Sequence, residues 1–211
     1  MKKRLPQLLS VYSLLVLLVP AFLFLTAANS VAQGGSGTIQ GTAKSPWLTR
    51  YTALIYIDHV KGAFPPPAKK IHISQKDLVF NPHINPILKG TTVDFTNDDT
   101  VVHNVFSPPG SASLFNLGNY GQGVSRSYTF DKLGVTTLLC SLHPEMEAFV
   151  IALQNPFYAL TDHAGNFKIE HVPPGTYQLK FWNEKLKADP QTVTVTAGKT
   201  TAVTFKDLKK K

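Results

Sequence analysis

Short stretches in which apolar and polar residues alternate recur along the chain. A period of two places alternate side chains on one face, and it predicts strands with one buried face. The alternating apolar positions are Ala53/Ile55/Ile57, Val93/Phe95, Phe149/Ile151/Leu153, Phe167/Ile169, Tyr177/Leu179/Phe181, Val193/Val195 and Val203/Phe205. Turn-forming residues lie between many of them: Asn97-Asp98-Asp99, Pro108-Pro109-Gly110, His163-Ala164-Gly165, Pro173-Pro174-Gly175 and Ala197-Gly198. After the N-terminal apolar run no stretch keeps a helical period over three turns, so the pattern predicts an all-β protein built of β-sandwiches.

The N-terminus has a different pattern. A basic start at residues 2–4 is followed by an apolar run over residues 8–28 and by the small residues Ser30-Val31-Ala32. These features predict a signal peptide over residues 1–32, an exported or periplasmic protein, and no stable membrane insertion after cleavage. The alternative is an uncleaved membrane anchor, since about 20 apolar residues can cross a bilayer. Pro20 and the small residues favour cleavage.

Turn-rich and Pro-rich stretches divide the rest of the chain. The segment KGAFPPPA at residues 61–68 cannot continue a helix and reads as a connection. We expect a β segment at 37–60 that joins one of the sandwiches, a β domain at 69–154, a smaller β-sandwich at 155–205 and a basic tail at 206–211.

The positive charge lies mostly at the two ends. The chain of 211 residues has 21 Lys+Arg against 13 Asp+Glu, a formal net charge of +8. Loss of the three basic residues at positions 2–4 lowers it to +5, and the tail KDLKKK carries four Lys and one Asp, which leaves +2 on the remainder. No basic stripe interleaved with aromatic residues is present, which excludes nucleic acid as the expected partner.

Sulfur is scarce and concentrated. The chain has one Cys and two Met, and Met1 leaves with the signal peptide, so Cys140 and Met146 remain. Oxidising compartments favour paired cysteines, and Cys140 has no partner in this chain. A metal ion that holds the thiolate would account for this.

The spacing C-x-x-H-x-x-M joins Cys140, His143 and Met146 after a Thr/Leu-rich strand. A thiolate, an imidazole and a weak thioether form the ligand set of a blue-copper electron-transfer site, provided that one more His joins them. His103, in DDTVVHNVF, is the best candidate. The remaining histidines are weaker candidates. A surface or core role is expected for His83, and no thiol or carboxylate lies at a useful ligand spacing from His59, His72, His163 and His171.

The region from Phe80 to Leu153 resembles the cupredoxins, a family that includes plastocyanin, pseudoazurin and amicyanin. The matching residues are Phe80, Pro82, Gly90-Thr91-x-Val93, Asn97-Asp98, His103-Asn104-Val105, Gly134 and C-x-x-H-x-x-M. The short ligand loop resembles that of amicyanin more than that of plastocyanin. HNVFS, FNLGNYGQG and CSLHPEM are still more similar to exported cupredoxin-like proteins described as methylamine utilization proteins.

The resemblance implies a Greek-key β-sandwich that holds one type 1 copper ion. It makes His103, Cys140 and His143 the equatorial ligands and Met146 the weak axial ligand. It also implies that Asn104, beside the first His, ties the ligand loops together and that Ser141 helps to receive this tie. One-electron transfer follows, with a redox partner protein docking near His143 on an apolar surface formed by Leu142, Pro144 and Pro108-Pro109.

The run TDHAGNFKIEHVPPGTYQLKFWNE resembles the carboxypeptidase-regulatory-like, or transthyretin-like, β-sandwich. In that module a D-x-x-G-x-F hairpin precedes a P-P-G-x-Y turn. No catalytic residue is evident in it, so a scaffold or docking role is expected.

Other functions stay open from the residues alone. Cys140 and His143 could act as a nucleophile and base, but cysteine hydrolases bring their His from a distant part of the fold. Zinc prefers four Cys or His ligands over a thioether. A binding module that stores or delivers copper, or binds a cell-envelope component, shares every ligand. No H-x-H pair exists to build a multicopper oxidase, and we expect no enzyme activity.

Overall fold

The structure is a computed structural model. In the part of the chain that it describes, the segments with alternating apolar residues form strands. The structure describes residues 35–45 and 52–211, and every helix-or-strand element assigned within them is a strand. The predicted all-β class is therefore confirmed. The predicted signal peptide at 1–32 falls outside the described residues. Within them, no helix is long and apolar enough to cross a membrane.

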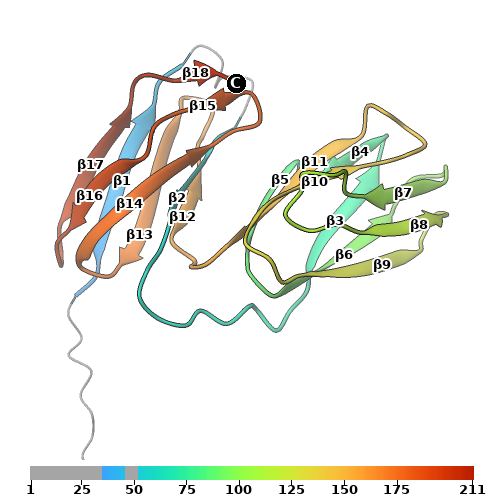
Figure 1. The fold of residues 1–211 in the computed structure, drawn as a ribbon, viewed down its shortest axis with the longest axis horizontal. Helices are drawn as coiled ribbons and strands as arrows, with labels where there is room; N and C mark the ends of the chain where they lie inside the picture. The colour runs from blue at the N-terminus through green and yellow to red at the C-terminus, as the bar shows by residue number, and fades with distance from the viewer. Residues whose placement is uncertain (1–34, 46–51) are drawn as a thin grey trace, which may run out of the picture. The chain divides into compact units, whose positions relative to one another are not determined.

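One group of strands forms two facing sheets, seen in green and yellow in Figure 1. A five-stranded sheet has the order β5 (Ile84–Leu88), β11 (Glu147–Leu153), β10 (Gly134–Leu139), β7 (His103–Phe106) and β8 (Asn116–Tyr120). A four-stranded sheet has the order β4 (Val79–Asn81), β3 (Ile71–Lys76), β6 (Thr91–Asn97) and β9 (Ser125–Phe130). The pairs β5/β11 and β3/β6 are parallel, and the other pairs are antiparallel. We call this group the first sandwich.

The core of the first sandwich follows from the alternating pattern. Val93 and Phe95 of β6 are fully buried against Leu138 of β10 and Val150 of β11. Burial of such side chains is the main stabilising contribution to a fold of this kind. Cys140 and Met146 belong to the same cluster.

A second group of strands includes the N-terminal segment. Its three-stranded sheet has the order β13 (Asn166–Val172), β1 (Gly37–Ala43) and β17 (Thr200–Phe205). Its four-stranded sheet has the order β12 (Tyr158–Leu160), β2 (Leu54–Ile57), β14 (Gly175–Trp182) and β16 (Gln191–Val195). Side chains from both sheets, among them Ile39, Phe167 and Phe205, fill one core. We call this group the second sandwich.

The basic tail predicted after residue 205 carries a short strand. β18 (Lys209–Lys210) pairs with β15 (Leu186–Lys187) in an antiparallel ladder. The positive charge of the tail does not exclude strand pairing, because the ladder uses backbone groups and the two lysine side chains of β18 stay exposed. The tail is therefore part of the folded chain.

Strand β11 differs from the one-faced strand that its sequence predicts. Ala148, Val150 and Ala152 pack into the core of the first sandwich, while Phe149 and Ile151 pack in a separate cluster with residues of β2 and β14. Both faces of the strand are therefore buried. The alternation of large with small side chains hid this, because alanine at a buried position looks like the polar half of a period-two pattern.

Candidate metal centre

Neighbouring strands bring the three predicted equatorial ligands to one end of the first sandwich. His103 is the first residue of β7, and Cys140 directly follows the last residue of β10. The two strands are antiparallel neighbours with Leu139 opposite Phe106, so the loop after Cys140 lies beside His103. His143 lies in that loop, before β11 begins.

The donor atoms of these residues lie close together. The Nδ1 atoms of His103 and His143 are 3.1 Å apart, and the Cys140 Sγ lies 3.7 Å from the His143 Nδ1. One ligand atom from each of the three residues lies within 4.8 Å of the others, and in the described part of the chain no other group of His, Cys, Asp or Glu does this. Two imidazole nitrogens and one sulfur therefore face one small volume. This set of nitrogen and soft sulfur donors fits copper.

Burial is uneven around the three ligands. His103 is fully buried and Cys140 is 4% exposed, while His143 is partly exposed. Solvent therefore reaches the donor group at His143, whereas His103 and Cys140 are shielded from solvent by the protein. This arrangement leaves one edge of the three-residue group, at His143, near the surface.

Met146 is fully buried in the same core cluster as Cys140. Its backbone N–H donates to the carbonyl oxygen of His143 at 3.0 Å, which closes a tight turn at the end of the ligand loop. The chain then enters β11 at Glu147. Because Leu139 pairs with Glu147 across β10 and β11, the loop that carries positions 140, 143 and 146 lies at one end of the sandwich.

Asn104 joins three segments by hydrogen bonds. Its backbone N–H donates to the Cys140 Sγ at 3.4 Å, and its Nδ2 donates to the Asn116 Oδ1 at 2.9 Å. Its Oδ1 accepts from the backbone N–H of Ser141 at 3.4 Å. The tie to Ser141 therefore uses the main chain rather than the hydroxyl. Asn116, on β8, is a partner that the sequence did not indicate.

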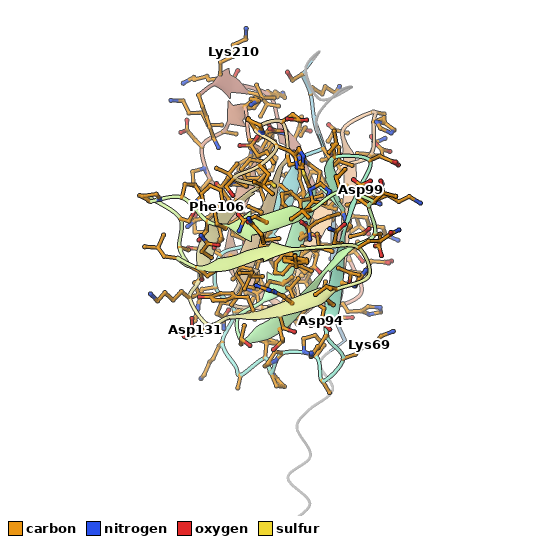
Figure 2. All side chains as sticks on the ribbon, turned by 90° about the vertical axis from the view of Figure 1, so that its right-hand side faces the viewer. Lys69, Asp94, Asp99, Phe106, Asp131 and Lys210 are labelled. Atoms are coloured by element: carbon orange, nitrogen blue, oxygen red, sulfur yellow. The ribbon has the colours of Figure 1, made fainter. Side chains whose placement is uncertain are left out.

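Asp99 is a functional candidate that sequence reasoning treated only as a turn residue. Its Oδ2 lies 3.0 Å from the Nε2 of His103, on the side of the ring away from His143. Figure 2 labels Asp99 before β7 and Phe106 at the end of that strand. The backbone N–H of Leu78, which donates to the carboxylate, and then the bond to His103 hold the pKa of Asp99 below its ordinary value. The spacing of four residues between Asp99 and His103 was the signal available in the sequence.

The other histidines do not join this donor group. His83 contacts the carbonyl of Glu147 through Nδ1 and the carboxylate of Glu184 through Nε2, at 3.0 and 3.1 Å. His72 lies 4.0 Å from a carboxylate oxygen of Asp98 on the surface. Neither contact contains a thiol.

Apolar side chains are exposed on the segments next to the ligands. Leu142 is 44% exposed, and Val101 and Val102, which precede His103, are 42% and 47% exposed. Pro144 is also exposed. The sequence indicated Leu142 and Pro144 but not the two valines, whose pattern reads as the start of a buried strand.

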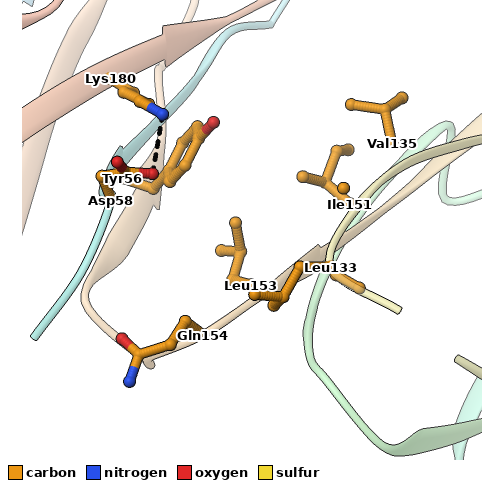
Figure 3. A pocket seen from close by; sticks show the side chains of 10 residues that line it. Tyr56, Asp58, Leu133, Val135, Ile151, Leu153, Gln154 and Lys180 are labelled. Atoms are coloured by element: carbon orange, nitrogen blue, oxygen red, sulfur yellow. Dashed lines mark ion pairs between the residues drawn. The ribbon is translucent and has the colours of Figure 1, made fainter. Parts of the chain in front are cut away.

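A pocket of about 220 Å³ lies elsewhere, and no predicted ligand lines it. Figure 3 shows its two kinds of lining: the ion pair of Lys180 with Asp58 beside Tyr56, and the apolar side chains of Ile151 and Leu153. Burial raises the pKa of the Tyr56 phenol.

Comparison with protein families found one match. Residues 134–203 match the family model described as polysaccharide lyase family 4, domain II. No curated protein sequence matches the chain.

The solved structures that are similar to the chain include cupredoxins. A purple cupredoxin from Nitrosopumilus maritimus has 28% identity and a TM-score of 0.36, over 39% of this chain and 99% of that one. Amicyanin from Paracoccus versutus has 21% identity and a TM-score of 0.37, over 46% and 96%. A copper-containing nitrite reductase from Thermus scotoductus SA-01 has 21% identity and a TM-score of 0.40, over 55% of this chain but only 28% of that one. The structural neighbours are cupredoxins.

Proposed function

We propose that this protein is an exported copper protein that carries single electrons between redox partners. One type 1 copper ion would be held by His103, Cys140 and His143, with Met146 as the weak axial ligand. The observation that carries the proposal is the convergence of two imidazole Nδ1 atoms and one thiol within 4.8 Å. Copper, when bound to such a set, supplies a one-electron couple between Cu(I) and Cu(II).

The donor set favours copper over a structural zinc ion. Structural zinc is held by four Cys or His ligands, and this group offers one thiol and two imidazoles. The proposed fourth donor is the thioether of Met146, which belongs to the same buried cluster as Cys140. Soft thioether ligands suit copper.

The residues around the ligands would keep the site rigid during electron transfer. Asn104 bonds to the thiol of Cys140, to Asn116 and to the backbone of Ser141, so the ligand loop is fixed to β7 and β8. Such outer contacts orient ligands and tune a metal site. Because the ligands need not move far between the two oxidation states, the electron crosses with little reorganisation.

The partly exposed edge of His143 would be the route for the electron. The exposed side chains of Leu142, Pro144, Val101 and Val102 would form an apolar surface for transient docking of a redox partner. Short-lived redox encounters use small interfaces of less than about 1,200 Å². Pro108-Pro109 contributes a further apolar turn to the surface that we propose.

Two further features would support this role. Export through a signal peptide at 1–32 would place Cys140 in an oxidising compartment, where a copper ion bound to the thiolate would account for the absence of a disulfide partner. The module at 155–205, which resembles the carboxypeptidase-regulatory-like sandwich, would serve as a scaffold or docking unit with no catalytic role.

Cyclic voltammetry of the copper-loaded protein, residues 33–211, tests the carrier role. We expect a reversible one-electron wave and an unchanged copper content after repeated cycles in the presence of a Cu(I) chelator. His163→Ala, a change at an exposed position in the second sandwich, is the matched control and should behave like the wild type. Loss of copper in the reduced state would contradict an electron carrier and favour copper delivery.

A further inference from the structure

The ring of His103 is held from both sides. Its Nδ1 faces the Nδ1 of His143 at 3.1 Å, and its Nε2 faces the Oδ2 of Asp99 at 3.0 Å. The imidazole is fully buried, while the carboxylate is 16% exposed. Asp99 is thus the group through which the buried ring communicates with the surface.

Asp99 is itself held in place. Its Oδ2 accepts from the backbone N–H of Leu78 at 3.0 Å, and its own N–H donates to the Oδ1 of Asn97 at 2.9 Å. The Nδ2 of the fully buried Asn97 donates to the carbonyls of Val101 and Tyr120, at 2.8 and 3.0 Å. These bonds close the loop before β7 and aim the carboxylate at His103.

This contact determines which nitrogen of His103 carries the proton. A carboxylate accepts hydrogen bonds and cannot donate one when ionised, so the Nε2 of His103 must carry the hydrogen. The Nδ1 then presents its lone pair to the volume shared with His143 and Cys140. The carboxylate also places a negative charge beside the ring, which stabilises the more positive state of any ion bound to Nδ1.

We propose that Asp99 is the positioning residue of the metal centre: it fixes the metal-binding tautomer of His103 and lowers the reduction potential of the site. This inference rests on the proposed copper function for its second half, the potential. The first half, the tautomer, concerns the copper-free protein and can be tested without any metal.

Two substitutions separate charge from hydrogen bonding. Asp99→Asn keeps an oxygen that can accept from Leu78 and His103 but removes the charge, and Asp99→Ala removes both. Asp98→Asn is the matched control, because Asp98 is the exposed neighbour and its carboxylate contacts Ser74 and His72 instead of a ligand. All three variants change the formal charge equally.

The first measurement is nitrogen-15 NMR of the His103 ring in the copper-free protein. We expect the Nε2–H tautomer in the wild type, Asp98→Asn and Asp99→Asn, and a mixture of tautomers in Asp99→Ala. A single Nε2–H tautomer in Asp99→Ala would overturn the role of Asp99 in fixing the ring.

The second measurement is the reduction potential of the copper-loaded proteins. In Asp99→Asn we expect the equilibrium to shift about tenfold toward Cu(I), which is about 59 mV for one electron, with the visible band retained. Asp99→Ala should in addition bind copper about 10- to 100-fold more weakly. Equal shifts in Asp99→Asn and Asp98→Asn, or no shift in either, would overturn the role in setting the potential. A wild-type protein that takes up no copper would instead refute the proposed function, while the NMR result would still decide the tautomer.

Discussion

Among the described residues, only the first sandwich contains a group of His and Cys side chains that converge on one point. In the second sandwich, Asn183 is buried and bonds to the backbone of Thr52, Lys185 and Leu186, and buried Thr161 accepts from the backbone N–H of Ala53. The bonds to Lys185 and Leu186 close a turn, and those to Thr52 and Ala53 join segments far apart in the sequence. In the first sandwich, buried Asn97 also bonds to backbone carbonyls, but buried His103 contacts the side chains of Asp99 and His143, and the backbone N–H of Asn104 donates to the Cys140 thiol.

This difference separates structural polar residues from functional ones. A buried polar group costs free energy unless it is hydrogen-bonded, and the cheapest partner is a nearby backbone group that itself needs a bond. At the candidate metal centre, by contrast, side chains from β7 and from the loop after β10 converge on one another. Such convergence has no structural need, and it therefore marks the site.

The largest expected effect comes from removing a converging side chain. His103→Ala should abolish specific copper binding and the visible band, because it deletes one of the two imidazole ligands. His163→Ala, in the second sandwich, should leave both unchanged, since that residue is exposed. Copper content after dialysis and the visible spectrum check this. Retention of the band in His103→Ala would show that His103 is not a ligand.

Truncation of a core side chain should lower the stability of either sandwich, but only a truncation in the first sandwich should disturb the proposed metal centre. Phe95 and Phe205 are buried to the same degree, at 0% and 1% exposure. Each change to Ala should lower the free energy of unfolding by about 3–5 kcal/mol, because it leaves a cavity. Denaturant unfolding measures this loss.

The visible spectrum of the same two variants sharpens the comparison. Phe95 shares its cluster with Cys140 and Met146, so Phe95→Ala should alter the copper band, whereas Phe205→Ala should not. An equal spectral change in both variants would mean that the second sandwich shapes the metal centre, contrary to our account.

A smaller effect is expected when the tie beside the ligands is cut. Asn104→Ala removes the side-chain bonds to Asn116 and Ser141 but keeps the backbone N–H that donates to the Cys140 Sγ. Copper affinity should fall about 10- to 100-fold while the band persists. Asn166→Ala, which removes a side-chain bond to Asp162 in the second sandwich, is the control. Competition titration with a chelator gives the affinities, and a wild-type affinity for Asn104→Ala would contradict the assigned role.

The smallest effect concerns a turn of the second sandwich. The side chain and then the backbone N–H of Asn166 hold the pKa of Asp162 below its ordinary value of 3.8. A carboxyl group whose pKa is lower in the folded state contributes stability above its unfolded-state pKa and loses it as the pH falls through the folded-state value. Asp162→Asn should therefore destabilise the protein slightly at pH 7, and the difference from the wild type should shrink below pH 3.8 and vanish once the pH is below the folded-state pKa. Urea unfolding at pH 7 and in acid measures it, and a difference that grows in acid would contradict the assignment.

The alternating pattern predicted seven of the described strands, β2, β6, β11, β13, β14, β16 and β17, and local spacing indicated three of the proposed metal ligands. Alternation records burial on one face, and the spacing of Cys140, His143 and Met146 records a loop that must return to the same end of the sheet. Both are properties of neighbouring residues. His103, which lies on another strand, was chosen by its position after a turn, and the resemblance to cupredoxins also implies it.

What the sequence did not indicate depends on contacts between distant strands. Asn116 meets Asn104 because β8 pairs with β7, and the second buried face of β11 arises because residues from β2 and β14 cover Phe149. Asp99 is close to His103 in sequence, but its direction depends on Leu78 from another loop. Such closures are decided by tertiary packing, which a one-dimensional pattern does not contain.

The visible absorption spectrum of the copper-loaded protein, taken together with its metal content, tests the central claim most directly. We predict one copper ion per chain and an intense blue or green colour in the Cu(II) form, because a thiolate ligand gives strong charge-transfer absorption. Cys140→Ser should be colourless while keeping its fold, as judged by circular dichroism. A colourless Cu(II) form of the wild-type protein would contradict the account.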